Sequence, residues 1–483
     1  MKSITLILLI ILITFAASQS GRTEEMSGGL SRVEDFLGIQ APVATLDEIE
    51  QRGLLSAKTA VQPWSGSAWT DIHGSIADPY FSGGTWWPTS WSNNREYIVR
   101  QDRQEKLRKL ALMSSEQLWS LRRDQRLDLM LFLDSASPAE KYDLLLGNSD
   151  LPLSSAVIAM IDQFSQSGQT ALWTGICHGW SPAALTLSRP EKAITLQSPS
   201  GLEIQFYPTD IKALASFLWA KSFAQNYVEI EGTRCFGQIA RNEYGRIIDP
   251  SCFDVNPAFL HLALVNQIGV KKRGLIIDRN YGAEVFNQPA FGYTFNYFNP
   301  ITGRKVSHSH LAQVPLNAES TDLFSQYRSP KAVALIGVNL KLSYINEGKP
   351  NHAVTDAPAS DSVEYLELQY DLELDSRGVI VGGEWRDYTN AQRRTGSVVG
   401  GHVHPDILWV VPQDLKAWSI ADTNDLLEQT PWGGEGPLPS AWREAALKAA
   451  NARALDQNNQ PTIIQPQPLA HVIDVLLRRS SSH

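Results

Sequence analysis

The segment 95–146 has the pattern of amphipathic helices. Apolar residues recur there at helical spacing among many charged residues, which a helix would turn toward solvent. Ser137 and Glu140 are spaced as in a capping box, and Pro138 would occupy the first helical position. We therefore expect a short helix to start at this box and to end at Gly147.

Strand patterns dominate residues 301–415. Apolar and polar residues alternate over 333–344 and 363–374, and a third apolar run at 379–385 follows a turn signal at 376–378. Together the two patterns predict an α+β fold, with an N-terminal helical region and a C-terminal strand-rich region.

The beginning of the chain has the features of a signal peptide. Within residues 1–18, Lys2 precedes an uncharged apolar run, and small residues follow at 16–18. The run is shorter than the ~20 residues that span a bilayer, so we expect cleavage and secretion, to an extracellular or periplasmic location. Residues 21–60 are polar and weakly patterned, which indicates a linker or a pro-segment.

The last part of the chain, 416–483, is expected to be a helical tail. Ser440 is placed to cap a helix over 441–455, and a second short helix is expected over 469–479. Between them, 457–467 is rich in Asn, Gln and Pro, which is typical of a linker.

Composition narrows the classes of function. Of 483 residues, 43% are hydrophobic and 19% are charged, as in globular proteins, and the net charge of −9 gives no field that attracts nucleic acid. No later run is apolar enough to cross a membrane, so we expect no integral membrane protein. Residues 61–91 are rich in Gly, Ser and Trp and are interpreted as a packed, Trp-lined loop; a carbohydrate-stacking platform is the alternative.

Export makes the three cysteines informative. In an oxidising compartment two should pair and one should remain. Cys235 and Cys252 are 17 residues apart and flank a turn-rich segment, so their closure into a disulfide is easy. Cys177 is then the odd thiol.

The residues around Cys177 suit an activated nucleophile. Gly175 permits a tight turn before it, and the residues after it can begin a helix. A thiol at a helix N-terminus faces backbone N–H groups and the positive end of the helix dipole, which lower its pKa and can hold an oxyanion. Besides the N–H of Cys177 itself, Trp173 and Gln169 are candidate oxyanion donors.

A base must approach Cys177 from elsewhere in the fold, and His261 is the best candidate. It lies in an apolar run, and a strand pattern that ends at Asp278 follows 17 residues later. That arrangement would put a carboxylate beside the imidazole to fix its tautomer. Asn280 and then Asp254 are the alternative orienting residues. The order Cys, His, Asp is that of papain-like acyl-transfer sites, although 254–269 could be helix or strand.

The other histidines fit the role of base less well. His178 is adjacent to Cys177, and neighbours on a helix point about 100° apart. His73 lies in a loop and two more lie in the tail. The pairs His308/His310 and His402/His404 could each supply two metal ligands without an obvious third, so a metal site stays unknown.

One peptide carries a resemblance to a known family. The transglutaminase elicitors, secreted transglutaminases of oomycetes with homologues in marine bacteria, share the pattern Val-Trp-Asn-Gln-Pro-Val-x-Gly-Phe. This chain resembles it at 285–293, with Phe286 in place of Trp followed by Asn287, Gln288 and Pro289. The likeness also covers the Cys177 segment and most of 61–415.

The resemblance implies a catalytic unit at 61–415, with its core at 151–300, and implies protein–glutamine γ-glutamyl transfer to lysine or other primary amines, often with calcium. Phe286 to Pro289 would then line the groove for the acyl donor. A segment at 386–403 resembles an insertion, and the tail is not covered. Two alternatives stay open: a secreted cysteine peptidase or amidase, and a recognition protein without activity.

Overall fold

The computed structural model describes most of the chain in several stretches. These are residues 30–80, 90–166, 171–222, 229–236, 240–279, 284–316, 322–386, 404–412, 427, 429–451 and 468–481. The expected signal peptide, the linker at 457–467 and nearly all of the insertion at 386–403 lie outside them. Among the described residues, no helix is both long and apolar enough to span a bilayer.

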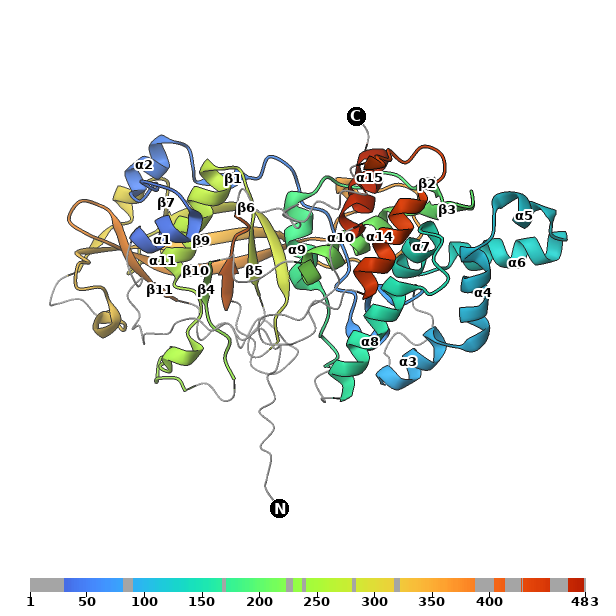
Figure 1. Ribbon diagram of the computed structural model, residues 1–483. Coiled ribbons are helices and arrows are strands. Elements are labelled where there is room, and N and C mark those ends of the chain that lie inside the picture. The colour runs from blue at the N-terminus through green and yellow to red at the C-terminus, as the bar shows by residue number, and fades with distance from the viewer. Residues whose placement is uncertain are drawn as a thin grey trace, which may run out of the picture.

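Most of the helices gather on one side of the molecule, as Figure 1 shows. They are α3 (Trp91–Ile98), α4 (Gln101–Ala111), α5 (Ser115–Ser120), α6 (Arg123–Asp134), α7 (Pro138–Leu145), α8 (Pro152–Gln166), α9 (Cys177–Thr186), α10 (Pro208–Ser222), α14 (Ser440–Asn451) and α15 (Leu469–Ser480). The predicted capping box is confirmed: Ser137 and Glu140 each accept the other's backbone N–H at the start of α7. Both expected tail helices are present, and residues 452–455 of the first lie outside the described stretches.

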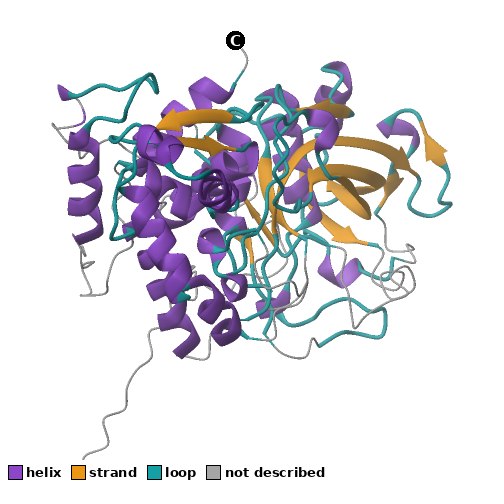
Figure 2. Cartoon of the chain, turned by 90° about the vertical axis from the view of Figure 1, so that its right-hand side faces the viewer, coloured by secondary structure: helices purple, strands orange, loops and turns teal. Residues whose placement is uncertain are grey.

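Strands form one large sheet beside these helices (Figure 2). Its main strands are β4 (Ile230–Gly232), β5 (Leu275–Asp278), β6 (Asn287–Phe298), β9 (Ala334–Ile345), β10 (Val363–Leu374), β11 (Ile380–Trp385) and β12 (Ile407–Trp409). The order is β11-β10-β9-β6-β5-β12-β4, and these neighbours pair antiparallel. Short strands β1 (Ser56–Lys58), β7 (Lys305–Val306) and β8 (Val314–Pro315) add to it, and β2 (Ile194–Gln197) pairs with β3 (Glu203–Phe206) separately. The mixed fold and the strand-rich region are as predicted.

The two faces of the sheet belong to two different hydrophobic cores. Alternate strand residues point to opposite faces, so Ile276 of β5 and Trp409 of β12 join the core that contains α9 and α10. We call this the helix-side core. Their neighbours Ile277 and Leu408 join a second core, the far-side core, which also contains Tyr370 of β10. Which face a residue occupies therefore decides which chemistry it can reach.

Helices of the N-terminal segment cover the far-side core. The helices α1 (Leu30–Leu37) and α2 (Leu46–Gln51) contribute buried apolar residues to this core, and β1 pairs with β6. Phe36 packs edge-on against Phe259, with ring centroids 5.0 Å apart. A linker does not describe residues 30–58, because a linker would not supply core residues. A pro-segment stays a prediction.

The segment 254–269 is helical. Asn256 accepts the N–H groups of Ala258 and Phe259 and so caps α11 (Pro257–Ala263), which continues as a turn of π-helix, η5 (Leu264–Val270). A capping asparagine followed by proline favours a helix start over a strand. The helix packs on β10 and β11, on the far-side core.

Candidate active site

Cys177 is the first residue of α9, and the preceding turn is tightly held. Ile176 donates its N–H to Ala68 O at 2.7 Å. A Cβ on Gly175 would lie 2.5 Å from that same oxygen, and a Cβ on Gly179 would lie 2.1 Å from Ser216 O of α10. Only glycine fits at these close approaches, so the two glycines fix the start of α9 against its neighbours.

The thiol of Cys177 faces the start of β6. Its Sγ lies 3.6 Å from the carbonyl oxygen of Val285 and 3.6 Å from Nδ2 of Asn287. The backbone N–H of Asn287 also bonds the sulfur. Trp409 donates its indole N–H to Oδ1 of Asn287 at 2.9 Å, which turns the amide nitrogen toward the thiol. Asn287 is thus a two-donor partner of the sulfur.

Burial and nearby acids keep this thiol protonated. Cys177 is only 6% exposed, and burial raises its pKa to about 12, with the carboxylates of Glu347 and Asp278 adding to the rise. The two hydrogen bonds from Asn287 act in the opposite direction and favour the thiolate. The helix start alone therefore does not activate Cys177, contrary to the expectation from its sequence position.

Asp278 lies beside the thiol site, as predicted, but not as a partner of His261. It ends β5 directly opposite Asn287 in the sheet register, and its Oδ1 accepts the backbone N–H of Phe286 at 2.9 Å. These contacts shape the turn into β6, the turn that carries Val285 and Asn287 to the sulfur.

His261 does not meet Cys177 in this structure. It lies on α11, where Nδ1 and the Tyr370 hydroxyl are 2.8 Å apart and Phe295 packs on the ring with centroids separated by 4.5 Å. Tyr370 and Phe295 belong to the far-side core, whereas Cys177 belongs to the helix-side core. The sheet therefore separates the imidazole from the sulfur. Burial lowers the pKa of His261 to about 3, as expected for a neutral core histidine. The pairing with Cys177 that was expected from the sequence does not fit.

Asp254, the third candidate orienting residue, holds a different histidine. Its Oδ2 lies 2.9 Å from Nδ1 of His404, whose ring stacks on Trp385 with centroids 4.1 Å apart. His178 lies next to Cys177 but bonds the backbone of Ala220, and its pKa falls to about 4 through burial and then the charge of Lys221. Within the described stretches no histidine bonds Cys177; Asn280 and His402 lie outside them.

The other predicted site residues divide into two groups. Trp173 and Phe286, both half-buried, lie with ring centroids 6.4 Å apart next to the thiol segment and can line an approach to it. Gln288 and Pro289 are buried within β6, and Gln288 is 1% exposed, so neither lines a groove as the sequence suggested. Gln169 lies outside the described residues.

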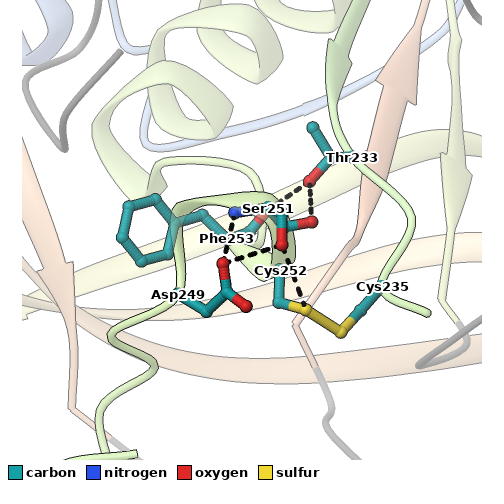
Figure 3. Close-up of a disulfide and its surroundings, with 6 residues drawn as sticks. All are labelled: Thr233, Cys235, Asp249, Ser251, Cys252 and Phe253. Atoms are coloured by element: carbon teal, nitrogen blue, oxygen red, sulfur yellow. Dashed lines mark hydrogen bonds between the residues drawn. A yellow bond between two sulfur atoms is a disulfide. The ribbon is translucent and has the colours of Figure 1, made fainter. Parts of the chain in front are cut away.

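The predicted disulfide joins Cys235 to Cys252 (Figure 3), which leaves Cys177 as the free cysteine. Around the disulfide, the Thr233 hydroxyl donates to the carbonyl oxygen of Ser251, and the Ser251 hydroxyl donates to Asp249 at 2.7 Å. In the described part of the chain, no three His, Cys, Asp or Glu residues gather closely enough to hold a metal ion. Calcium dependence thus stays an expectation from the resemblance.

Sequence reasoning missed Trp409 and Glu347 and assigned Asn287 to the groove alone. The alternation of residues along 275–278 and 407–409 contained part of the signal, because it puts Asp278 and Trp409 on the same face of two neighbouring strands, with Asp278 opposite Ile407 and Trp409 opposite Ile276. The remaining positions of the site residues depend on the length and register of β6 and β9, which cannot be predicted from a single sequence.

The crystal structure of the GP42 transglutaminase from Phytophthora sojae is similar over 79% of this chain and 89% of that chain, with 21% identity and a TM-score of 0.48. No curated protein matches. The sequence profile of the family described as transglutaminase elicitor matches residues 154–419, more than half of the chain. This chain belongs to the transglutaminase elicitor family.

Proposed function

We propose that this protein is a secreted protein-glutamine γ-glutamyltransferase whose nucleophile is Cys177. One observation carries the proposal: the free cysteine stands at the first residue of α9 and receives two hydrogen bonds from Asn287. Donors that favour a thiolate serve equally to stabilise the negative oxygen of a tetrahedral intermediate close to the same sulfur. Family membership supports the same class of reaction.

The reaction proceeds in two acyl transfers. The Cys177 thiol gives up its proton and its sulfur attacks the carboxamide carbon of a protein glutamine; the carbon–nitrogen bond breaks, the nitrogen takes up that proton and leaves as ammonia, and a thioester remains. A primary amine such as a lysine side chain then attacks the thioester, forming an isopeptide bond and releasing the thiol. The aromatic rings of Trp173 and Phe286 exclude water beside the sulfur, which favours the amine over hydrolysis.

Activation of the thiol is the demanding step. With its pKa raised to about 12 by burial, Cys177 is almost wholly protonated at neutral pH. Binding of a glutamine carboxamide beside Asn287 would have to shift that balance.

The same burial favours a second candidate, a secreted recognition protein without catalytic activity. That candidate requires Cys177 to be unreactive toward substrates and toward small alkylating agents.

The test uses the full chain and its Cys177→Ala variant, each with and without calcium. Incorporation of a fluorescent primary amine into a glutamine-rich protein, together with ammonia release, is expected from the wild type and absent from the variant. Cys177-dependent ammonia release or peptide cleavage without incorporation would indicate a hydrolase. No reaction in any arm, and no alkylation of native Cys177 by iodoacetamide, would favour the recognition protein.

A further inference from the structure

Glu347 lies two residues beyond the end of β9, the strand next to the one that carries Asn287. Asp278 of β5 pairs with Asn287 of β6, and Ala290 of β6 pairs with Tyr344 of β9. Ile345, the last residue of β9, is buried in the helix-side core together with Cys177, and the charge of Glu347 acts on the thiol.

The backbone around Glu347 is fixed against the same structure that supports α9. Gly348 donates its N–H to Gly66 O at 2.6 Å, and the Ser65 hydroxyl donates to Asn346 O at 3.2 Å. The carbonyl oxygen of Trp64, which precedes Ser65 and Gly66 in the chain, accepts the indole N–H of Trp180 of α9 at 3.2 Å. Glu347 therefore has a set position relative to the nucleophile.

The carboxylate at this position has an oxygen that is not satisfied by the protein. Oε1 of Glu347 is buried and has no hydrogen-bond partner among the described residues. The nearby cation is Arg279, whose guanidinium lies over the Tyr344 ring at 5.8 Å from its centroid. Native proteins leave few buried polar atoms unpaired, and those few call for a functional reason.

A carboxylate beside the thiol is unfavourable for the first half of the proposed reaction. Its charge adds to the burial that raises the pKa of Cys177. A group that opposes formation of the nucleophile has a use if it serves the second substrate. The acyl acceptor of a γ-glutamyl transfer is a primary ammonium ion, which is a good partner for a carboxylate oxygen that is buried and lacks a hydrogen bond, as Oε1 of Glu347 does.

We propose that Glu347 is the binding site for the acceptor amine. The inference rests on the proposed acyl transfer and names the residue that recognises its second substrate. The ammonium of a lysine side chain donates to Oε1 of Glu347 while the thioester is in place on Cys177.

Each proton lost by the acceptor nitrogen has an acceptor at this site. Glu347 takes one proton from the ammonium, which leaves a neutral amine. Its lone pair attacks the thioester carbonyl, the carbon–sulfur bond breaks as the tetrahedral intermediate collapses, and the second nitrogen proton passes to the sulfur. Glu347 then releases its proton to solvent. Burial raises the pKa of this carboxyl, which makes it a better proton acceptor than an exposed glutamate.

The test compares wild type with Glu347→Gln, and uses Glu367→Gln as a matched control. Glu367 is an exposed glutamate of β10 that pairs with Lys341. Ammonia release and amine incorporation are measured at increasing concentrations of a lysine-type amine and, separately, of hydroxylamine, which is neutral at neutral pH. We expect Glu347→Gln to raise KM for the cationic amine at least about tenfold, while hydroxylamine still reacts.

Alkylation of native Cys177 supplies a readout that does not depend on turnover. It is expected to become faster in Glu347→Gln, because removal of the carboxylate lowers the pKa of the thiol. Glu347→Asp keeps the charge and should restore part of the preference for the cationic amine. This second variant keeps the proposal testable if Glu347→Gln fails to fold.

The outcomes separate the two proposals. An active wild type whose KM for the cationic amine is the same in Glu347→Gln and Glu367→Gln overturns the role of Glu347 alone. Equal losses with the cationic amine and with hydroxylamine also overturn it. A wild type that neither releases ammonia nor incorporates amine overturns the proposed function and the role of Glu347 with it.

Discussion

Trp409 fixes which end of the Asn287 amide faces the nucleophile. Its indole nitrogen donates to Oδ1 at 2.9 Å, so Nδ2 is the atom that lies 3.6 Å from Sγ of Cys177. The opposite orientation would aim an amide oxygen at the sulfur and repel a thiolate. A tryptophan on β12 thereby sets the electrostatics of a cysteine on α9, through an asparagine on β6.

Replacing Asn287 with alanine should slow every reaction of Cys177. The change removes the side-chain donor that favours the thiolate, so the pKa of the thiol rises further. Loss of one such donor typically costs about 10²–10³-fold in turnover. Iodoacetamide labelling quenched at a series of times and followed by mass spectrometry measures the alkylation rate of Cys177 directly.

Asn296→Ala is the matched control for that experiment. Asn296 lies on the exposed side of the same strand and bonds only Asn339. Its labelling rate should equal that of the wild type. A normal rate in Asn287→Ala would contradict the assignment of Asn287 as the partner of the sulfur.

His261 should govern stability in acid rather than catalysis. Its pKa falls from 6.5 to about 3 on folding because the imidazole is buried. The unfolded chain therefore binds a proton that the folded protein refuses, and stability is lost as pH falls from about 6.5 toward 3. The loss from this one group approaches about 1.4 kcal/mol per pH unit.

His261→Gln tests this, since glutamine can still bond Tyr370 but does not titrate. Urea unfolding at pH 7 and pH 5 should show a smaller loss of unfolding free energy in the variant than in the wild type. Iodoacetamide labelling of Cys177 should be unchanged between them. A large fall in labelling would restore His261 as a partner of the thiol.

The disulfide should stabilise the segment between Cys235 and Cys252. It closes a loop of 17 residues, for which the loss of loop entropy in the unfolded chain corresponds to roughly 3 kcal/mol. The double variant Cys235→Ser/Cys252→Ser should unfold at lower urea concentration. In denatured wild type without reductant, alkylation should modify one cysteine, and after reduction three. Two or more modified cysteines before reduction would argue against the pairing.

Gly179→Ala should displace the helix that carries the nucleophile. The new methyl would meet the backbone of α10 at 2.1 Å from Ser216 O and 2.5 Å from Ala220 N, so the two helices must separate. Overpacking of this kind costs about 1–3 kcal/mol. Gly433→Ala is the control, because nothing lies within 4 Å of its added methyl. Thermal unfolding that is equal in the two variants would show that the close approach is not required.

Local signals along the chain predict most of the helices and strands well. The capping box at Ser137, the strands β9 to β11 and the helix start at Cys177 are each set by a few adjacent residues, and each lies where the pattern predicts. The disulfide also followed from simple counting, because one pair of cysteines was close in sequence and flanked by turns.

The partners of Cys177 were harder to predict because they depend on which face of the sheet each residue occupies. His261 and Asp278 are close in sequence, yet α11 packs on the far-side core while Asp278 points toward α9. Residues 257–263 form a helix that packs on the far-side core, and His261 therefore lies across the sheet from Cys177. Pattern analysis of one sequence left that choice open.

The Asn-Gln-Pro peptide has a consequence beyond the site. Residues 287–291 lie at the start of β6, where β5 pairs with 287–290 and β9 begins to pair at Ala290, and all five are buried. A receptor that reads this peptide side chain by side chain would find it only in chains that have been cut or unfolded. Binding of such a receptor would therefore indicate that the protein has been cleaved or unfolded, because the intact fold buries the peptide.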